Sequence, residues 1–208
     1  MATNGDDLID SLARRVRDTT NTAYPRTFLL DILNRVTRCL NAGLRLKLAS
    51  ASFTPTAQRA LYQTTEVAAD VIRVVAVREG GRDLQEVPPD HLTFQDNEWV
   101  RRQGPRPEVW SRIGRDLLVI APCQMQSPPA LTVHYISVPT AITDAATPIE
   151  TPPDEYVPVL LDLSEALALL SSRVHNAPSA IRAPLERASN ALGIEIKLQA
   201  DVHEGGSA

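Results

Sequence analysis

Residues 110–170 decide the fold and contain three segments: WSRIGRDLLVIAP at 110–122, LTVHYISVP at 131–139, and PIETPPDEYVPVLLDLSEALALL at 148–170. The first two segments are rich in β-branched residues and are bounded by Gly and Pro, which predicts strands. The third is an almost continuous apolar run behind a Pro-rich entry, which predicts one long helix over about 156–172. The chain therefore passes from a β module into a helix.

The segments before residue 110 predict two helices and further strands. Apolar residues at helical spacing begin after Asp6, and a second apolar stripe follows Pro25 and ends at Gly43, a usual left-handed helix cap. From residue 44 to 139 the pattern changes to short alternating runs, with Gly80-Gly81 placed as a tight hairpin turn between strands at 71–77 and 82–87. Residues 91–99 are expected to be a short helix or irregular.

Two helices are predicted after the β module. The first carries two apolar stripes, and the second stripe consists of Val159, Leu163, Ala166 and Leu170. A helix that is apolar on two faces is either buried centrally or shared between the core and a neighbouring subunit. The last helix runs from about residue 180 to Gly193, and the following IEIKL alternates as a strand-like arm, or else forms a final helical turn or an edge strand.

The predicted fold class is therefore α+β. Two N-terminal and two C-terminal helices form a helical bundle over residues 6–43 and 153–193, and a small antiparallel β-sandwich or barrel is inserted at residues 44–139. Residues 194–208 are a C-terminal arm and tail.

Length and charge limit the function classes. The chain has 208 residues, a net charge of −4 and 43% hydrophobic residues, which favours one globular domain or one domain with an inserted module. A protein that grips nucleic acid through phosphates normally has a strong basic excess, which is absent here. The longest apolar run, 157–170, contains Asp162 and Glu165 and is too short to span a bilayer, so we expect a soluble protein made inside the cell.

The sequence offers no signal for catalysis, a cofactor or a metal ion. The two cysteines are far apart and the four histidines are scattered, without metal-ligand spacing. Motifs for an esterase nucleophile, a phosphate loop or a dinucleotide site do not occur. Asp154 and Glu155 are expected to be favourable charges at a helix start rather than an acid–base pair. We therefore expect a protein that is not an enzyme.

One basic loop is a candidate binding element. Arg101, Arg102 and Arg106 lie among Gly and Pro residues and could contact DNA phosphates or an acidic partner, or simply form a solvated loop. Trp99 and Trp110 are expected to be anchors of the β module, although an exposed pair could stack on a sugar.

The order of these segments resembles the adaptor (head-to-tail connector) proteins of tailed bacteriophages, over most of residues 25–193. The resemblance rests on FLLDILNRVTRCLNAGL at 28–44, PEVWSRIGRDLLVIAP at 107–122, LTVHYISVP, IETPPDEYVPVLLDLSEALALL at 149–170, and RVHNAPSAIRAPLERASNALG at 173–193.

The resemblance implies a structural role in the virion neck, at the head–tail junction, after assembly in the host cytoplasm. Such adaptors form a ring, usually dodecameric, that docks under the portal protein, helps to close the DNA-filled head and joins it to the next neck or tail component. DNA passes through the ring without tight binding, which permits ejection. By the same resemblance, Ile194, Ile196 and Leu198 would be the portal-docking arm, and the helix at 156–172 would be the intersubunit wall through the stripe named above.

Two other functions remain open at this point. One is a tail or neck module that binds or hydrolyses host carbohydrate through the β insertion, and the other is a different head-closure or tail-completion factor.

Overall fold

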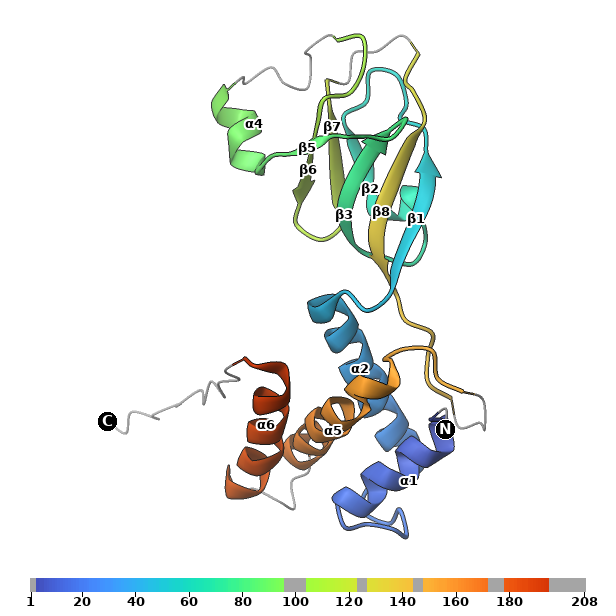
Figure 1. Cartoon of the computed structure of the whole chain (residues 1–208), viewed down its shortest axis with the longest axis vertical. Coiled ribbons are helices and arrows are strands. Elements are labelled where there is room, and N and C mark those ends of the chain that lie inside the picture. The colour runs from blue at the N-terminus through green and yellow to red at the C-terminus, as the bar shows by residue number, and fades with distance from the viewer. Residues whose placement is uncertain (1–2, 96–103, 123–126, 144–147, 172–177, 195–208) are drawn as a thin grey trace, which may run out of the picture. The chain divides into compact units, whose positions relative to one another are not determined.

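The computed structural model describes residues 3–95, 104–122, 127–143, 148–171 and 178–194 (Figure 1). These residues form six α-helices and two four-stranded sheets, so the predicted α+β class is confirmed. The chain divides into two compact units. One, the helical unit, contains residues 1–37 and 141–208, and the other, the β unit, contains residues 38–140.

The helical unit is built from helices at both ends of the chain. Its elements are α1 (Gly5–Arg15), the first part of α2 (Arg26–Leu44), the short 3-10 helix η1 (Asp154–Tyr156), α5 (Val157–Ser171) and α6 (Pro178–Leu192). The Asn4 side chain caps α1 by accepting the backbone N–H of Asp7 at 2.8 Å. Acidic residues in the first turn of α1 and Arg14 and Arg15 in its last turn complement the helix dipole.

The core of the helical unit is aliphatic. Helix α5 contacts both α1 and α6, and the side chains of Leu160 on α5 and Leu12 on α1 are fully buried. The chain that returns from the β unit is fixed to α2 by Asn34, whose side chain donates to the carbonyl of Ile142 at 3.0 Å and accepts its N–H at 2.8 Å. The helix predicted at 156–172 is confirmed to within one residue at each end.

The β unit contains two sheets that share one core (Figure 1). The first sheet has the order β1 (Leu48–Phe53), β8 (Leu131–Ser137), β3 (Val71–Glu79), β4 (Arg82–Asp83). The second has the order β2 (Leu61–Gln63), β7 (Leu117–Ala121), β6 (Val109–Ile113), β5 (Gln85–Glu86). Two short helices, α3 (Thr64–Val67) and α4 (Pro89–Gln95), complete the unit. The shared core contains Phe53, Tyr62, Val67, Val74, Val77, Leu84, Trp110, Leu118, Ile120, Leu131 and Val133.

The strand expected at 82–87 is divided between the two sheets, which corrects the prediction of a simple hairpin. The Gly80-Gly81 turn is present, with positive φ at both residues, but β4 pairs with β3 for only two residues. Leu84 then enters the shared core, and β5 pairs with β6 in the other sheet, in parallel. The chain thus passes from one sheet to the other at the buried Leu84. Because β5 and β6 are parallel, the module is not purely antiparallel.

The junction between α2 and β1 also differs from the prediction. Helix α2 continues through Gly43, and the left-handed residue after it is Arg45, with φ of 56°. Strand β1 therefore begins at Leu48 rather than near residue 44. The alternating run FTPTAQRALYQT at 53–64, which also predicted a strand, forms β2 only over Leu61–Gln63. A loop precedes this strand, and in it the Thr56 N–H donates to the Tyr62 hydroxyl at 3.0 Å.

Candidate interaction surfaces

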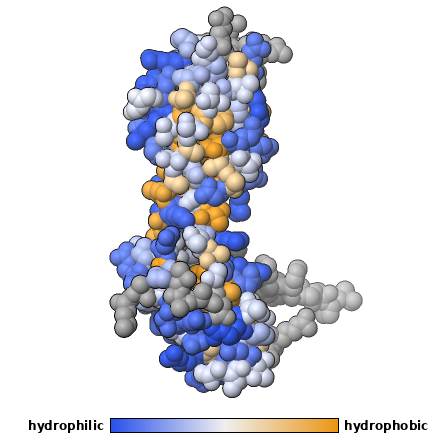
Figure 2. All heavy atoms as spheres, turned by 90° about the vertical axis from the view of Figure 1, so that its right-hand side faces the viewer, coloured by the Kyte–Doolittle hydropathy of each residue, from blue (hydrophilic) through white to orange (hydrophobic). Residues whose placement is uncertain are grey.

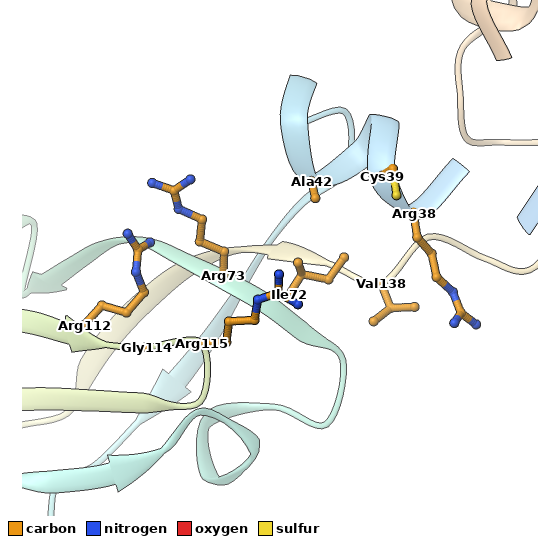
Figure 3. Close-up of a pocket in the computed structure, with 9 residues that line it drawn as sticks. All are labelled: Arg38, Cys39, Ala42, Ile72, Arg73, Arg112, Gly114, Arg115 and Val138. Atoms are coloured by element: carbon orange, nitrogen blue, oxygen red, sulfur yellow. The ribbon is translucent and has the colours of Figure 1, made fainter. Parts of the chain in front are cut away.

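The β unit contains an open hollow of about 710 Å³, which we call the arginine groove (Figure 3). Its walls come from four parts of the unit: the last turns of α2, strand β3, strand β6 with its following turn, and the residue after β8. The lining residues are Arg38, Cys39, Ala42, Ile72, Arg73, Arg112, Gly114, Arg115 and Val138.

The four arginines make the groove strongly basic. Among the described residues, no acidic side chain lines the groove and none of these arginines forms an ion pair. Arg112 is anchored, because its Nη1 donates to the carbonyl of Val74 at 3.4 Å, whereas Arg73 and Arg115 are exposed. Arg73 and Arg112 extend in the same direction from their strands (Figure 3). Unpaired guanidinium groups bind carboxylates and phosphates through paired N–H donors.

The groove also has an apolar part. Ala42, Ile72 and Val138 lie between the arginines, and Val138 is 37% exposed. The free thiol of Cys39 is exposed at the same place. On the face shown in Figure 2, apolar residues gather over the β unit within a largely hydrophilic surface. The groove can therefore accept a ligand that has both anionic and apolar groups.

A buried asparagine holds the helical wall of the groove in place. The Asn41 side chain is fully buried, donates to the carbonyl of Ser137 at 2.7 Å and accepts the N–H of Lys47 at 2.7 Å. These bonds join the end of α2 to β8 and to the segment before β1. Arg38 and Ala42, which lie on the same turns of α2, are thereby placed beside β3.

The helical unit contains a second polar cluster, which is paired. Asp162 on α5 accepts from Arg15 of α1 at 2.5 Å and from Arg187 of α6 at 2.9 Å, and Glu165 lies 2.8 Å from Arg187. The hydrogen bond with Asp162 raises the pKa of Arg187. Asp162 is buried, so these ion pairs connect three helices. The sequence suggested no partner for Asp162 and Glu165, because both arginines come from distant helices.

The residues predicted for the intersubunit wall occupy different environments. Val159 and Ala166 are 4% and 2% exposed and pack inside their own chain, Ala166 against Leu169 and Ile181. Leu163 is half-buried and Leu170 is 50% exposed. Of the four, Leu163 and Leu170 are the ones that a neighbouring molecule could reach.

The predicted arm and basic loop are only partly described. Ile194 follows α6 and is 54% exposed, and Arg106 is exposed. Ile196, Leu198, Arg101 and Arg102 lie outside the described residues.

The expectation that Trp110 anchors the β module is confirmed. Its side chain is 2% exposed within the shared core, so it cannot stack on a sugar at the surface. Trp99 lies outside the described residues. The carbohydrate alternative therefore loses one of its two candidate residues.

Within the described ranges, no three His, Cys, Asp or Glu side chains gather as metal ligands would. In the same ranges, no helix has the length and apolar character required to cross a membrane.

The four groove arginines were missed by the sequence analysis. Arg38 and Arg73 occur singly, as in VIRVVAV, whereas Arg112 and Arg115 lie three residues apart in SRIGRD, so three separate parts of the chain contribute. Only the pairing of β3 with β8 and β6 with β7, and the packing of α2 beside them, brings them together.

The described elements follow the order of two helices, a two-sheet β unit and two further helices. A family model described as SU10 adaptor protein matches residues 3–204. Because the match covers nearly the whole chain, the chain belongs to the SU10 adaptor protein family, and the resemblance to bacteriophage adaptors is confirmed. A search among curated proteins found no match.

Proposed function

We propose that this protein is a non-enzymatic component of the virion neck that forms a ring under the portal. One face of the ring meets the portal, and the other meets the next neck or tail protein. The observation that carries the proposal is the family match over residues 3–204. The ring helps to close the filled head and lets DNA pass during ejection. The ring is expected to be dodecameric.

Exposed apolar and charged groups support a role in assembly. Ile194, which begins the proposed portal-docking arm, and Leu170, at the end of α5, are half exposed to solvent. A contact with a partner would remove these apolar side chains from water, which is favourable by about 25 cal/mol for each Å² of apolar surface buried. The net charge of −4 supports passage of DNA without tight binding, because phosphate contacts require a basic excess.

Complementation of incomplete particles tests the proposal. DNA-filled heads are produced from a phage that lacks the gene for this chain, and the purified chain is then added together with tails. We expect the chain to bind the portal vertex, to reduce DNA leakage and to restore joining of tails. Heads that retain DNA and join tails equally well without the chain would contradict the proposed function.

A variant in which Ile194 is replaced by aspartate tests the arm in the same assay. We expect I194D to bind heads more weakly than the unaltered chain, while L61D, at an exposed leucine of β2 in the other unit, serves as the control for an added surface charge. Equal binding of the two variants would contradict a role of the arm in docking.

A further inference from the structure

We propose that the arginine groove of one copy binds the acidic segment of a second copy, where the acidic segment is residues 148–156 (PIETPPDEY). This inference rests on the proposed ring, and it identifies two surfaces through which neighbouring subunits would meet.

The acidic segment presents three carboxylates to solvent. Glu150, Asp154 and Glu155 are exposed, and none of them forms an ion pair in the described part of the chain. The N-cap of η1 is Pro153, without a side-chain capping bond, so these carboxylates do not cap the helix as acceptors. Among the described residues, the Thr3 hydroxyl donates to an Asp154 carboxylate oxygen at 3.2 Å.

The acidic segment is held in a defined conformation before any partner binds. The N–H of Ile149 donates to the carbonyl of Thr3 at 2.9 Å, and the N–H of Tyr156 donates to the carbonyl of Pro153 at 2.9 Å. Three prolines further restrict the backbone. A segment that is already ordered loses less conformational entropy on binding, which favours affinity.

The two units of the chain have opposite charge. Residues 38–140 contain twelve Lys and Arg against ten Asp and Glu, whereas the remaining residues contain nine Lys and Arg against fifteen Asp and Glu. The chain therefore carries both a basic surface and a complementary acidic surface, in different units. Complementary charges at an interface set its register and exclude wrong partners.

The chemistry of the groove favours a protein segment over DNA. Ala42, Ile72 and Val138 would lie against apolar groups, which a sugar–phosphate backbone presents poorly. The acidic segment offers Ile149 and Tyr156, both partly accessible, beside its carboxylates. Arginine and carboxylate form paired, planar hydrogen bonds, which fix the orientation of the two groups as well as attracting them.

A contact between two different surfaces has a consequence for assembly. Each copy would use its groove for one neighbour and its acidic segment for the other, which is a head-to-tail contact. Head-to-tail contacts extend until the rotation closes a ring. The proposed pair of surfaces thus supplies the type of interface that a neck ring requires.

Disulfide trapping in the full chain tests the contact, because Cys39 already lies in the groove. The variant C123S/E150C keeps Cys39 and adds one thiol in the acidic segment. We expect mild oxidation to give covalent dimers and longer oligomers, about tenfold more than C123S/E186C, whose added thiol lies at an exposed acidic position of α6. Adding R73E/R115E, or the milder R73Q/R115Q, to C123S/E150C should abolish the products.

A charge exchange provides an independent measurement. The groove variant R73E/R115E and the segment variant D154R/E155R should each fail to self-associate in sedimentation velocity. Mixed, they should associate again, because the native groove of one variant meets the native segment of the other and the exchanged charges of the second contact are also complementary. Circular dichroism establishes that each variant is folded.

Several results would overturn the proposal. One is a yield of disulfide-linked oligomers from C123S/E150C that is no higher than the yield from C123S/E186C at the highest soluble concentration. Another is a disulfide between Cys39 and the added cysteine of the same chain. A third is binding to duplex DNA that R73E/R115E removes while no cross-link forms, which would make the groove a nucleic-acid surface. If particles contain the ring but these tests fail, only the groove contact is wrong, whereas absence of the chain from particles removes the proposed function itself.

Discussion

Replacing Asp162 by asparagine is expected to destabilise the helical unit by about 1–3 kcal/mol. The Asp162 carboxylate is 6% exposed and accepts N–H donors from Arg15 at 2.5 Å and Arg187 at 2.9 Å. Breaking a fully buried pair costs about 3–5 kcal/mol. The expected loss is smaller because the two arginine side chains are 31% and 50% exposed and Glu165 remains within 3.5 Å and 2.8 Å of them.

Urea unfolding followed by two signals checks this prediction. Far-ultraviolet circular dichroism reports mainly the helices, while tryptophan fluorescence reports the β unit through the buried Trp110. We expect D162N to lower the midpoint of the helical signal and to leave the fluorescence transition in place. The control is E186Q, which breaks the exposed pair between Glu186 and Arg182 and should cost less than about 0.5 kcal/mol. Equal losses in D162N and E186Q would refute the reasoning.

Three further predictions concern single polar groups. N41A should cost about 1–3 kcal/mol in urea unfolding, because it leaves the buried Ser137 carbonyl and the partly buried Lys47 N–H without this partner. A cost below that of the exposed control S50A would contradict this. The N–H groups of Tyr24, Thr22 and Ala23 hold the pKa of Asp18 below its ordinary value of 3.8. The stability that Asp18 contributes is therefore present above pH 3.8 and lost as the pH falls through the lower folded pKa. The difference in unfolding free energy between wild type and D18N should shrink on acidification. A difference that does not change with pH would contradict this prediction. Burial, and then the hydrogen bond to Asp70, raise the pKa of Tyr135. The stability that Tyr135 contributes should therefore be fully present below pH 10.0 and be lost as the pH rises through the higher folded pKa, so the advantage of wild type over Y135F should shrink at alkaline pH. Equal alkaline sensitivity of the two proteins would contradict this prediction.

Local patterns were sufficient for most elements of the fold. The apolar run that includes Leu160 and Leu167, behind a Pro-rich entry, predicted α5. The glycine pair Gly80-Gly81, which can adopt the positive φ that a tight turn requires, predicted the turn after β3. These signals act within a few residues, so they can be read from the sequence alone.

Features that depend on distant contacts were not predictable in the same way. The exchange of the chain between sheets at Leu84 depends on the shared core, which forms only when both sheets are present. The partners of Asp162 come from α1 and α6, and the arginine groove requires α2, β3 and β6 together. Sequence periodicity indicates which face of an element is apolar, but not which other element covers it.

The predicted stripe on α5 shows the same limit. Val159 and Ala166 have the spacing of an outward-facing stripe, yet α6 covers Ala166 through Ile181. A two-faced apolar helix could be covered by its own chain or by a neighbour, and here its own chain takes most of that surface.

Counting the chain in purified virions tests the central claim most directly. Quantitative mass spectrometry would compare the number of copies of this chain with the number of copies of the portal protein in the same particles. We expect a ratio near one, as in a symmetric ring in contact with the portal. Absence of the chain from particles, or a ratio set by tail fibres instead, would contradict it.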